Sequence, residues 1–243
     1  MTSERHAALW ASLGDKAFEE RRFEEALAAY ARAIRLNPDA AAPFRGKGHT
    51  LAALGRFEEA LAAYERAIVL APADAFGHLG YGSALHALGR FEEALAAYER
   101  ARDLAPGLMS AYAGKGRALA KLGRFEEALA AFDRALELAP YDEAACCEKA
   151  DLLYALKRYE EALATLAPLI ALDPYTPRLY QRQGLALLRL GRDAEALAAL
   201  EYALRLSPGD ALAHQGRGDA LRALGRQEEA EAAYAQARAL GGA

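Results

Sequence analysis

The chain has 243 residues, of which 53% are hydrophobic and 26% charged, and its formal net charge is −4. An acidic chain disfavours non-specific binding to nucleic acid, which depends on neutralising phosphates. No apolar run approaches the roughly 20 residues that cross a bilayer. The N-terminal residues MTSERHAALW lack the apolar core of a signal peptide, so we expect a cytoplasmic protein. The Ala-, Leu- and Arg-rich composition favours a bacterial source.

Six prolines recur at a spacing of 34 residues: Pro38, Pro72, Pro106, Pro140, Pro174 and Pro208. A fixed period of this length indicates tandem copies of one small unit that stack on each other. After a lead-in of residues 1–6, the period defines six full units and a seventh without the proline, at 7–40, 41–74, 75–108, 109–142, 143–176, 177–210 and 211–243. We expect one continuous solenoid over 7–243.

Each unit predicts two helices in succession. In the second unit, apolar residues recur at helical spacing up to Leu54 and again from Phe57 to Ile68. A glycine that can end the first helix separates such runs in five units, at Gly55, Gly89, Gly123, Gly191 and Gly225. The period-marking proline follows the second helix, which it cannot easily continue. Each unit is therefore predicted to be a helix hairpin.

The positions that stay constant between units are those where helices touch. Unit position 8 is glycine or alanine, position 20 is alanine from Ala26 to Ala230, and position 24 is aromatic in five of the seven units. With the proline at position 32, this pattern resembles the tetratricopeptide repeat family. The resemblance covers residues 7–243 and implies an all-α fold, an α-solenoid in which seven helix-turn-helix units form a right-handed superhelix.

The resemblance also implies a binding surface. In this family the first helix of each unit lines a concave groove through positions near 2, 5, 9, 12 and 13, which we call the first-helix surface. In units two to four these positions hold Arg45, Arg117 and Lys121 and no acid. The expected partner is a peptide or helix with acidic and apolar residues, although an ordinary solvated surface with scattered charges remains an alternative. The predicted contact residues are Arg45, His49, Phe76, Leu79, His86, Arg117, Lys121 and Tyr154.

The expected function is a non-enzymatic protein-interaction scaffold without metal or cofactor. The alternatives are a self-associating scaffold, end to end or dimeric, and a regulatory or targeting subunit of an enzyme complex. One family subgroup binds carboxylate termini of chaperones through a lysine at position 5 and an asparagine at position 9. Ala11 and Asp15 stand there in the first unit and no other unit restores the pair, so that role is disfavoured. The adjacent Cys146 and Cys147 cannot easily bridge each other.

Two regions depart from the pattern. Polar residues replace apolar ones near the ends, at Glu20, Gln227, Glu231 and Arg238, which suggests a complete seven-unit protein with capped ends. In the fifth unit, Pro168 lies inside the predicted second helix. It implies either a tolerated kink with local repacking or a change of superhelical curvature between units one to four and units five to seven.

Overall fold

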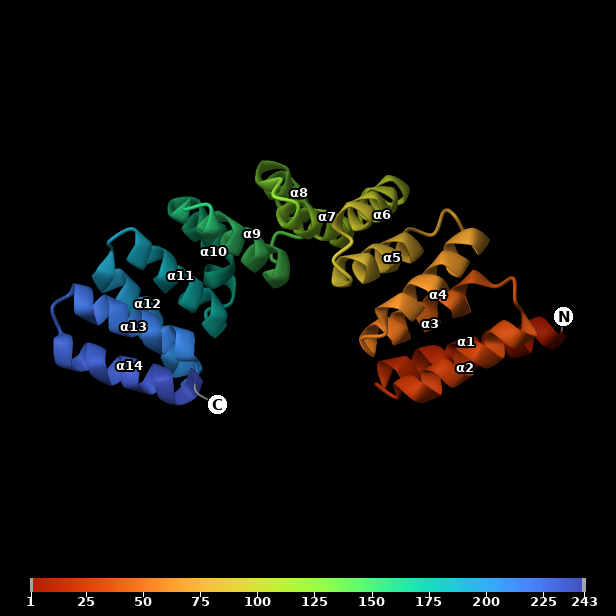
Figure 1. Cartoon of the computed structure of the whole chain (residues 1–243), viewed down its shortest axis with the longest axis horizontal. Coiled ribbons are helices and arrows are strands. Elements are labelled where there is room, and N and C mark those ends of the chain that lie inside the picture. Colours follow the sequence, from red (N-terminus) through yellow and green to blue (C-terminus); the bar gives the residue numbers. More distant parts are fainter. Residues whose placement is uncertain (1, 242–243) are drawn as a thin grey trace. The chain divides into compact units, whose positions relative to one another are not determined.

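The computed structural model describes residues 2–241, which form helices and no strands. Successive helices lie side by side as pairs along the chain (Figure 1). The fourteen helices of this range are α1 (Thr2–Glu19), α2 (Phe23–Leu36), α3 (Ala41–Ala53), α4 (Phe57–Leu70), α5 (Ala75–Ala87), α6 (Phe91–Leu104), α7 (Met109–Lys121), α8 (Phe125–Leu138), α9 (Glu143–Ala155), α10 (Tyr159–Leu172), α11 (Pro177–Arg189), α12 (Asp193–Leu206), α13 (Ala211–Ala223) and α14 (Gln227–Gly241).

The observed pairs confirm the predicted helix hairpins. In units two to seven the first helix begins at the first residue of the unit, as α3 does at Ala41 and α13 at Ala211. The lead-in is helical through residues 2–6, since α1 begins at Thr2. The position-20 alanines lie where the two helices of a pair meet, and each is at most 2% exposed. A larger side chain there would push the helices apart.

The turn between the paired helices requires a left-handed backbone. Gly55 has φ of 74°, and the four other separator glycines adopt the same conformation. In the first and fifth units, Arg21 and Lys157 occupy this turn with φ of 59° and 62°. A side chain in this region is strained relative to glycine, so the geometry of the repeat overrides the local preference at these two residues.

The chain divides into two compact units, Met1–Leu138 and Ala139–Ala243. The N-terminal compact unit holds the helices of repeats one to four, α1 to α8, and the C-terminal compact unit holds those of repeats five to seven, α9 to α14. Pro168 lies inside α10, which runs on to Leu172, and its neighbour Leu169 is buried. A single solenoid and a change of curvature near Pro168 both stay predictions.

Candidate partner-binding surface

Three first helices of the N-terminal compact unit line an open cavity of about 580 Å³. It draws on α1, α3 and α5, with one ring from α2, and it brings together the predicted contact residues Arg45, His49 and Phe76. Phe76 is 53% exposed, which is unusual for a large aromatic side chain. The lining residues are Ala11, Asp15, Phe18, Glu19, Tyr30, Ala42, Arg45, Gly46, His49 and Phe76.

Tyrosines from the second helices, of which Tyr30, Tyr64 and Tyr98 are buried and Tyr234 is partly buried, bond the position-9 side chains of the first-helix surface. The Tyr64 hydroxyl lies 2.8 Å from Nδ1 of His49, and the Tyr30 hydroxyl donates to Asp15 at 2.7 Å. The same bond joins Tyr98 to Ser83 at 3.3 Å and Tyr234 to Asp219 at 2.7 Å. Each pair is 15 residues apart, which is the spacing of unit positions 9 and 24.

Each of the first three tyrosine rings lies between two glycines. A methyl group added to Gly48, in the same repeat as Tyr64, would lie 2.7 Å from Cε1 of that ring. A methyl group added to Gly80, in the next repeat, would lie 2.5 Å from the same atom. Ordinary carbon contacts are about 3.5–4.0 Å. The glycines at positions 6 and 8 therefore make the space through which tyrosine reaches the first-helix surface.

The charge of Arg45 is partly neutralised by a residue outside the predicted surface positions. Its Nη1 lies 2.5 Å from Oδ2 of Asp74. Asp74 precedes α5 and its other carboxylate oxygen accepts a hydrogen bond from the backbone N–H of Phe76. Burial, with a further contribution from Arg45, lowers the pKa of His49, which favours the neutral ring.

Positive charge gathers further along the same compact unit, where α5 meets α7. Burial lowers the pKa of His86, and the nearby charges of Arg117 and Lys121 lower it further. The His86 ring lies 5.2 Å from the ring of Phe91, and its Nε2 is buried without a hydrogen-bond partner among the described residues. The Lys121 side chain is exposed to solvent, and the Leu79 side chain on α5 is partly exposed. His86, Arg117 and Lys121 therefore lie near one another where α5 meets α7.

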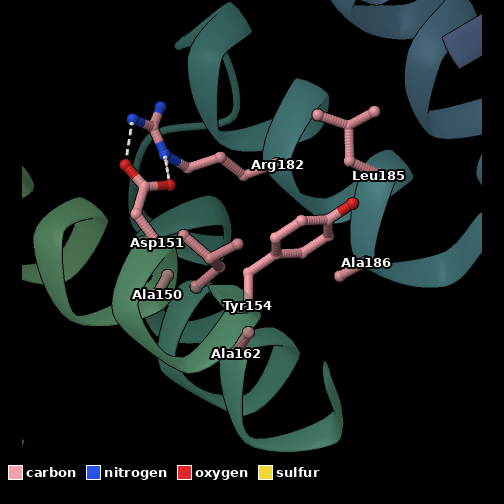
Figure 2. Close-up of a pocket in the computed structure, with 8 residues that line it drawn as sticks. Ala150, Asp151, Tyr154, Ala162, Arg182, Leu185 and Ala186 are labelled. Atoms are coloured by element: carbon pink, nitrogen blue, oxygen red, sulfur yellow. Dashed lines mark hydrogen bonds and ion pairs between the residues drawn. The ribbon is translucent and has the colours of Figure 1, made fainter. Parts of the chain in front are cut away.

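Tyr154, the eighth predicted contact residue, belongs to the C-terminal compact unit. Its hydroxyl accepts a hydrogen bond from Nε of Arg189 at 2.9 Å. It lines a cavity of about 60 Å³ between α9, α10 and α11 (Figure 2). Beside this cavity, Arg182 donates two hydrogen bonds to Asp151, at 2.7 and 2.8 Å. Sequence reasoning had not singled out Arg182, which occupies position 6, outside the family's surface positions.

Metal-ligand geometry, thiol chemistry and helix hydropathy can each be read from the described residues. Within residues 2–241, no three His, Cys, Asp or Glu side chains lie where they could hold a metal ion together. Both cysteines are free and buried, and burial raises the pKa of Cys146 to about 11 and also raises that of Cys147. A thiol with a raised pKa is a poor nucleophile at neutral pH. No helix in the described range combines the length and apolar character needed to cross a membrane.

Comparison with known families confirms the resemblance. A tetratricopeptide repeat model matches residues 12–75, 45–108, 82–143 and 182–243, and a second tetratricopeptide repeat model matches residues 119–183. Together these matches extend over residues 12–243. The chain belongs to the tetratricopeptide repeat (TPR) family.

Solved structures share the fold. YrrB, a TPR protein with an unusual peptide-binding site, is 26% identical, with a TM-score of 0.61 over 76% of this chain and 95% of YrrB. A MamA structure from Desulfovibrio magneticus RS-1 is 25% identical, with a TM-score of 0.63 over 69% of this chain and 94% of that one. A TPR protein from Parabacteroides merdae is 22% identical, covers 98% of this chain and 94% of its own, and has a TM-score of 0.72. No curated protein matches the chain at a significant level.

Proposed function

We propose that this protein is a non-enzymatic scaffold that binds a peptide or helical segment of a partner protein on its first-helix surface. The observation that carries this proposal is the cavity of about 580 Å³, which the first helices of three successive repeats line together. Its volume is in the range of sites that hold ligands. The likeness to YrrB, a TPR protein with an unusual peptide-binding site, supports peptide binding as a use of this fold.

The partner segment carries acidic and apolar residues. Arg117 and Lys121 place two cations near His86, and acidic partner residues would pair with them. Phe76, exposed in the cavity, and the partly buried Leu79 would contribute apolar contact area. The rigid helix pairs bring these groups to the surface before binding, which lowers the ordering cost of association.

The test reverses the two charges. The partner segment is identified by affinity capture from the source organism and synthesised, and its affinity is then measured by fluorescence anisotropy. The double variant Arg117→Glu/Lys121→Glu is expected to bind at least about tenfold more weakly, which corresponds to about 1.4 kcal/mol. The matched control Arg66→Glu/Arg100→Glu makes the same charge change on second helices and is expected to bind as the parent does. Equal affinities for both double variants would remove the proposal.

A self-associating scaffold is the second candidate. Leu9 in the first helix is 57% exposed and Leu240 in the last is 43% exposed, so apolar side chains remain at both ends of the repeat array. Light scattering would show a mass that rises with protein concentration and that Leu240→Glu returns to the monomer. A monomer mass at all concentrations argues against this candidate. The cytoplasmic location and a role within an enzyme complex stay predictions.

A further inference from the structure

The fifth repeat lacks the ring that the first four repeats place in their core. Leu166 stands at unit position 24, where Tyr30, Tyr64 and Tyr98 stand in the first three repeats. The two glycines that flank those rings are also changed, to Ala150 and Arg182. These three residues lie 16 positions apart in sequence and line one cavity. The three substitutions, one for a ring and two for glycines, therefore lie together at one place in the structure.

The replacement leaves an apolar space on the first-helix surface of the C-terminal compact unit. The cavity of about 60 Å³ has buried aliphatic walls from Ala150, Ala162, Leu166 and Ala186. Figure 2 shows the Arg182–Asp151 ion pair on one side of it and Tyr154 with Leu185 on the other. Asp151 remains 55% exposed and Tyr154 is partly buried, so the space lies next to solvent.

Arg182 replaces the tyrosine in its second role as well. In four repeats a tyrosine hydroxyl bonds the position-9 side chain, and in the fifth repeat Arg182 bonds Asp151 at that position. The carboxylate is thus satisfied from the side, by two charge-assisted hydrogen bonds, and no polar group has to fill the space that the ring vacated. The cavity wall stays aliphatic and its charged rim stays paired.

The volume of the cavity limits which side chain can occupy it. A water molecule takes about 30 Å³, and an apolar cavity that holds benzene has about 150 Å³. The present space is therefore too small for an aromatic ring and suits the branched tip of an aliphatic side chain. Apolar cavities of this kind do not retain water strongly, so filling one with methyl groups is favourable.

The positive charge next to the cavity indicates which kind of residue would stand beside the inserted side chain in a bound segment. Arg189 is exposed and donates from Nε to the Tyr154 hydroxyl. Arg178 is also exposed, one turn before Arg182 on α11. Neither arginine has a carboxylate at ion-pair distance among the described residues. An acidic residue beside the inserted side chain would complement both.

We propose that this cavity receives one aliphatic side chain of the size of valine or leucine from a bound segment, and that an adjacent acidic residue of the segment pairs with Arg189. The inference rests on the proposed function, since it assumes a bound segment, and it names the chemistry of that segment at the fifth and sixth repeats. The specificity for an aliphatic side chain is set by three residues: Leu166, Ala150 and Arg182.

The test uses small probes with the full-length protein. The amide of N-acetyl-leucyl-glutamate is titrated into methyl-labelled protein, and methyl NMR shifts of Leu166 and Leu185 are followed, with the buried Leu119 as an internal reference. Saturable shifts at Leu166 and Leu185 in the millimolar range are expected. The phenylalanyl-glutamate probe is expected to give none, and the leucyl-lysine probe to bind at least about threefold more weakly.

Two variants fill the cavity from different walls. Leu166→Phe and Ala162→Val are each expected to abolish the Leu185 shifts, so that the test survives if one of them fails to fold. Arg189→Gln is expected to reduce binding of the glutamate probe to the level of the lysine probe. The inference is overturned by unsaturable shifts in the parent, by equal binding of the phenylalanyl probe, or by shifts that persist in a folded filled variant. None of these outcomes affects the charge-reversal test, which concerns the other compact unit.

Discussion

Two glycines of the same helix are expected to respond in opposite ways to alanine substitution. Gly77 and Gly80 both lie in α5, and both are buried. A methyl group added to Gly77 would lie 3.5 Å from Cγ1 of Ile68, an ordinary contact. A methyl group added to Gly80 would lie 2.5 Å from Cε1 of Tyr64, whose side chain is 1% exposed and has no free space to enter.

The magnitude follows from three contributions. Alanine is favoured over glycine in a helix by up to about 1 kcal/mol, and this gain is common to both variants. Overpacking against Tyr64 costs about 1–3 kcal/mol. Displacement of the ring also strains the 2.8 Å contact of its hydroxyl with His49, worth about 0.5–1.5 kcal/mol. Gly80→Ala should therefore be about 1.5–4.5 kcal/mol less stable than Gly77→Ala.

Urea unfolding followed by circular dichroism measures this difference directly. Gly77→Ala should unfold at the parent's urea midpoint or above it, and Gly80→Ala clearly below it. A second variant checks the cause: Tyr64→Leu should remove most of the difference between the two alanine variants, since leucine lacks the ring. If Gly80→Ala were as stable as Gly77→Ala, the packing of tyrosine between glycines would be refuted.

Three further changes test other parts of the structure. Lys157→Gly should stabilise the protein by about 1 kcal/mol in urea unfolding, because Lys157 has φ of 62°; a loss of stability would show that its side chain compensates for the strain. Because the pKa of His49 and of His86 is lowered from 6.5 in the folded state, the unfolded chain binds more protons below pH 6.5. Stability should then fall as the pH is lowered from 6.5 through the folded-state pKa values, and His49→Gln should reduce that fall; NMR titration of either ring at or above 6.5 would contradict the burial argument. Pro168→Ala should stabilise α10 by up to about 3 kcal/mol, because it restores a backbone donor inside the helix; an unchanged urea midpoint would mean that the helix accommodates the ring without cost.

The helix pairs could be predicted from the sequence because their determinants are local and repeated. Glycine at the turn, alanine at position 20 and proline after the second helix each act within one repeat, and the copies confirm one another. The turn itself shows the limit of this reasoning. Arg21 and Lys157 adopt the glycine conformation without the glycine, since the packing of the flanking helices imposes it.

The surface could be predicted only in outline. Its helices and the grouping of Arg45, His49 and Phe76 follow from the repeat register. The ion pair between Arg45 and Asp74 does not, because Asp74 is the last residue of the same repeat, where it caps the N-terminus of α5, and lies outside the predicted surface positions. Positions 9 and 24, whose side chains bond each other, are separated by a constant 15 residues in the sequence. The side chain at position 9, however, changes from aspartate to histidine to serine between repeats.

The fifth repeat was recognised as irregular from Pro168, yet the structure places its larger departure elsewhere. Leu166, Ala150 and Arg182 exchange a ring and two glycines for a cavity and an ion pair. Read separately, each looks like a tolerated substitution. Only the knowledge that positions 24, 8 and the next repeat's 6 touch one another shows that the three changes belong together.

Photo-crosslinking of the partner segment tests the central claim most directly. A photo-reactive phenylalanine derivative is placed at Phe76, 53% exposed on the first helix α5, or at Val69, 66% exposed on the second helix α4. The two sites are similarly accessible, so exposure alone does not favour either one. Binding on the first-helix surface predicts crosslinks from position 76 and none above background from position 69. Equal or stronger crosslinking from position 69 would contradict the account.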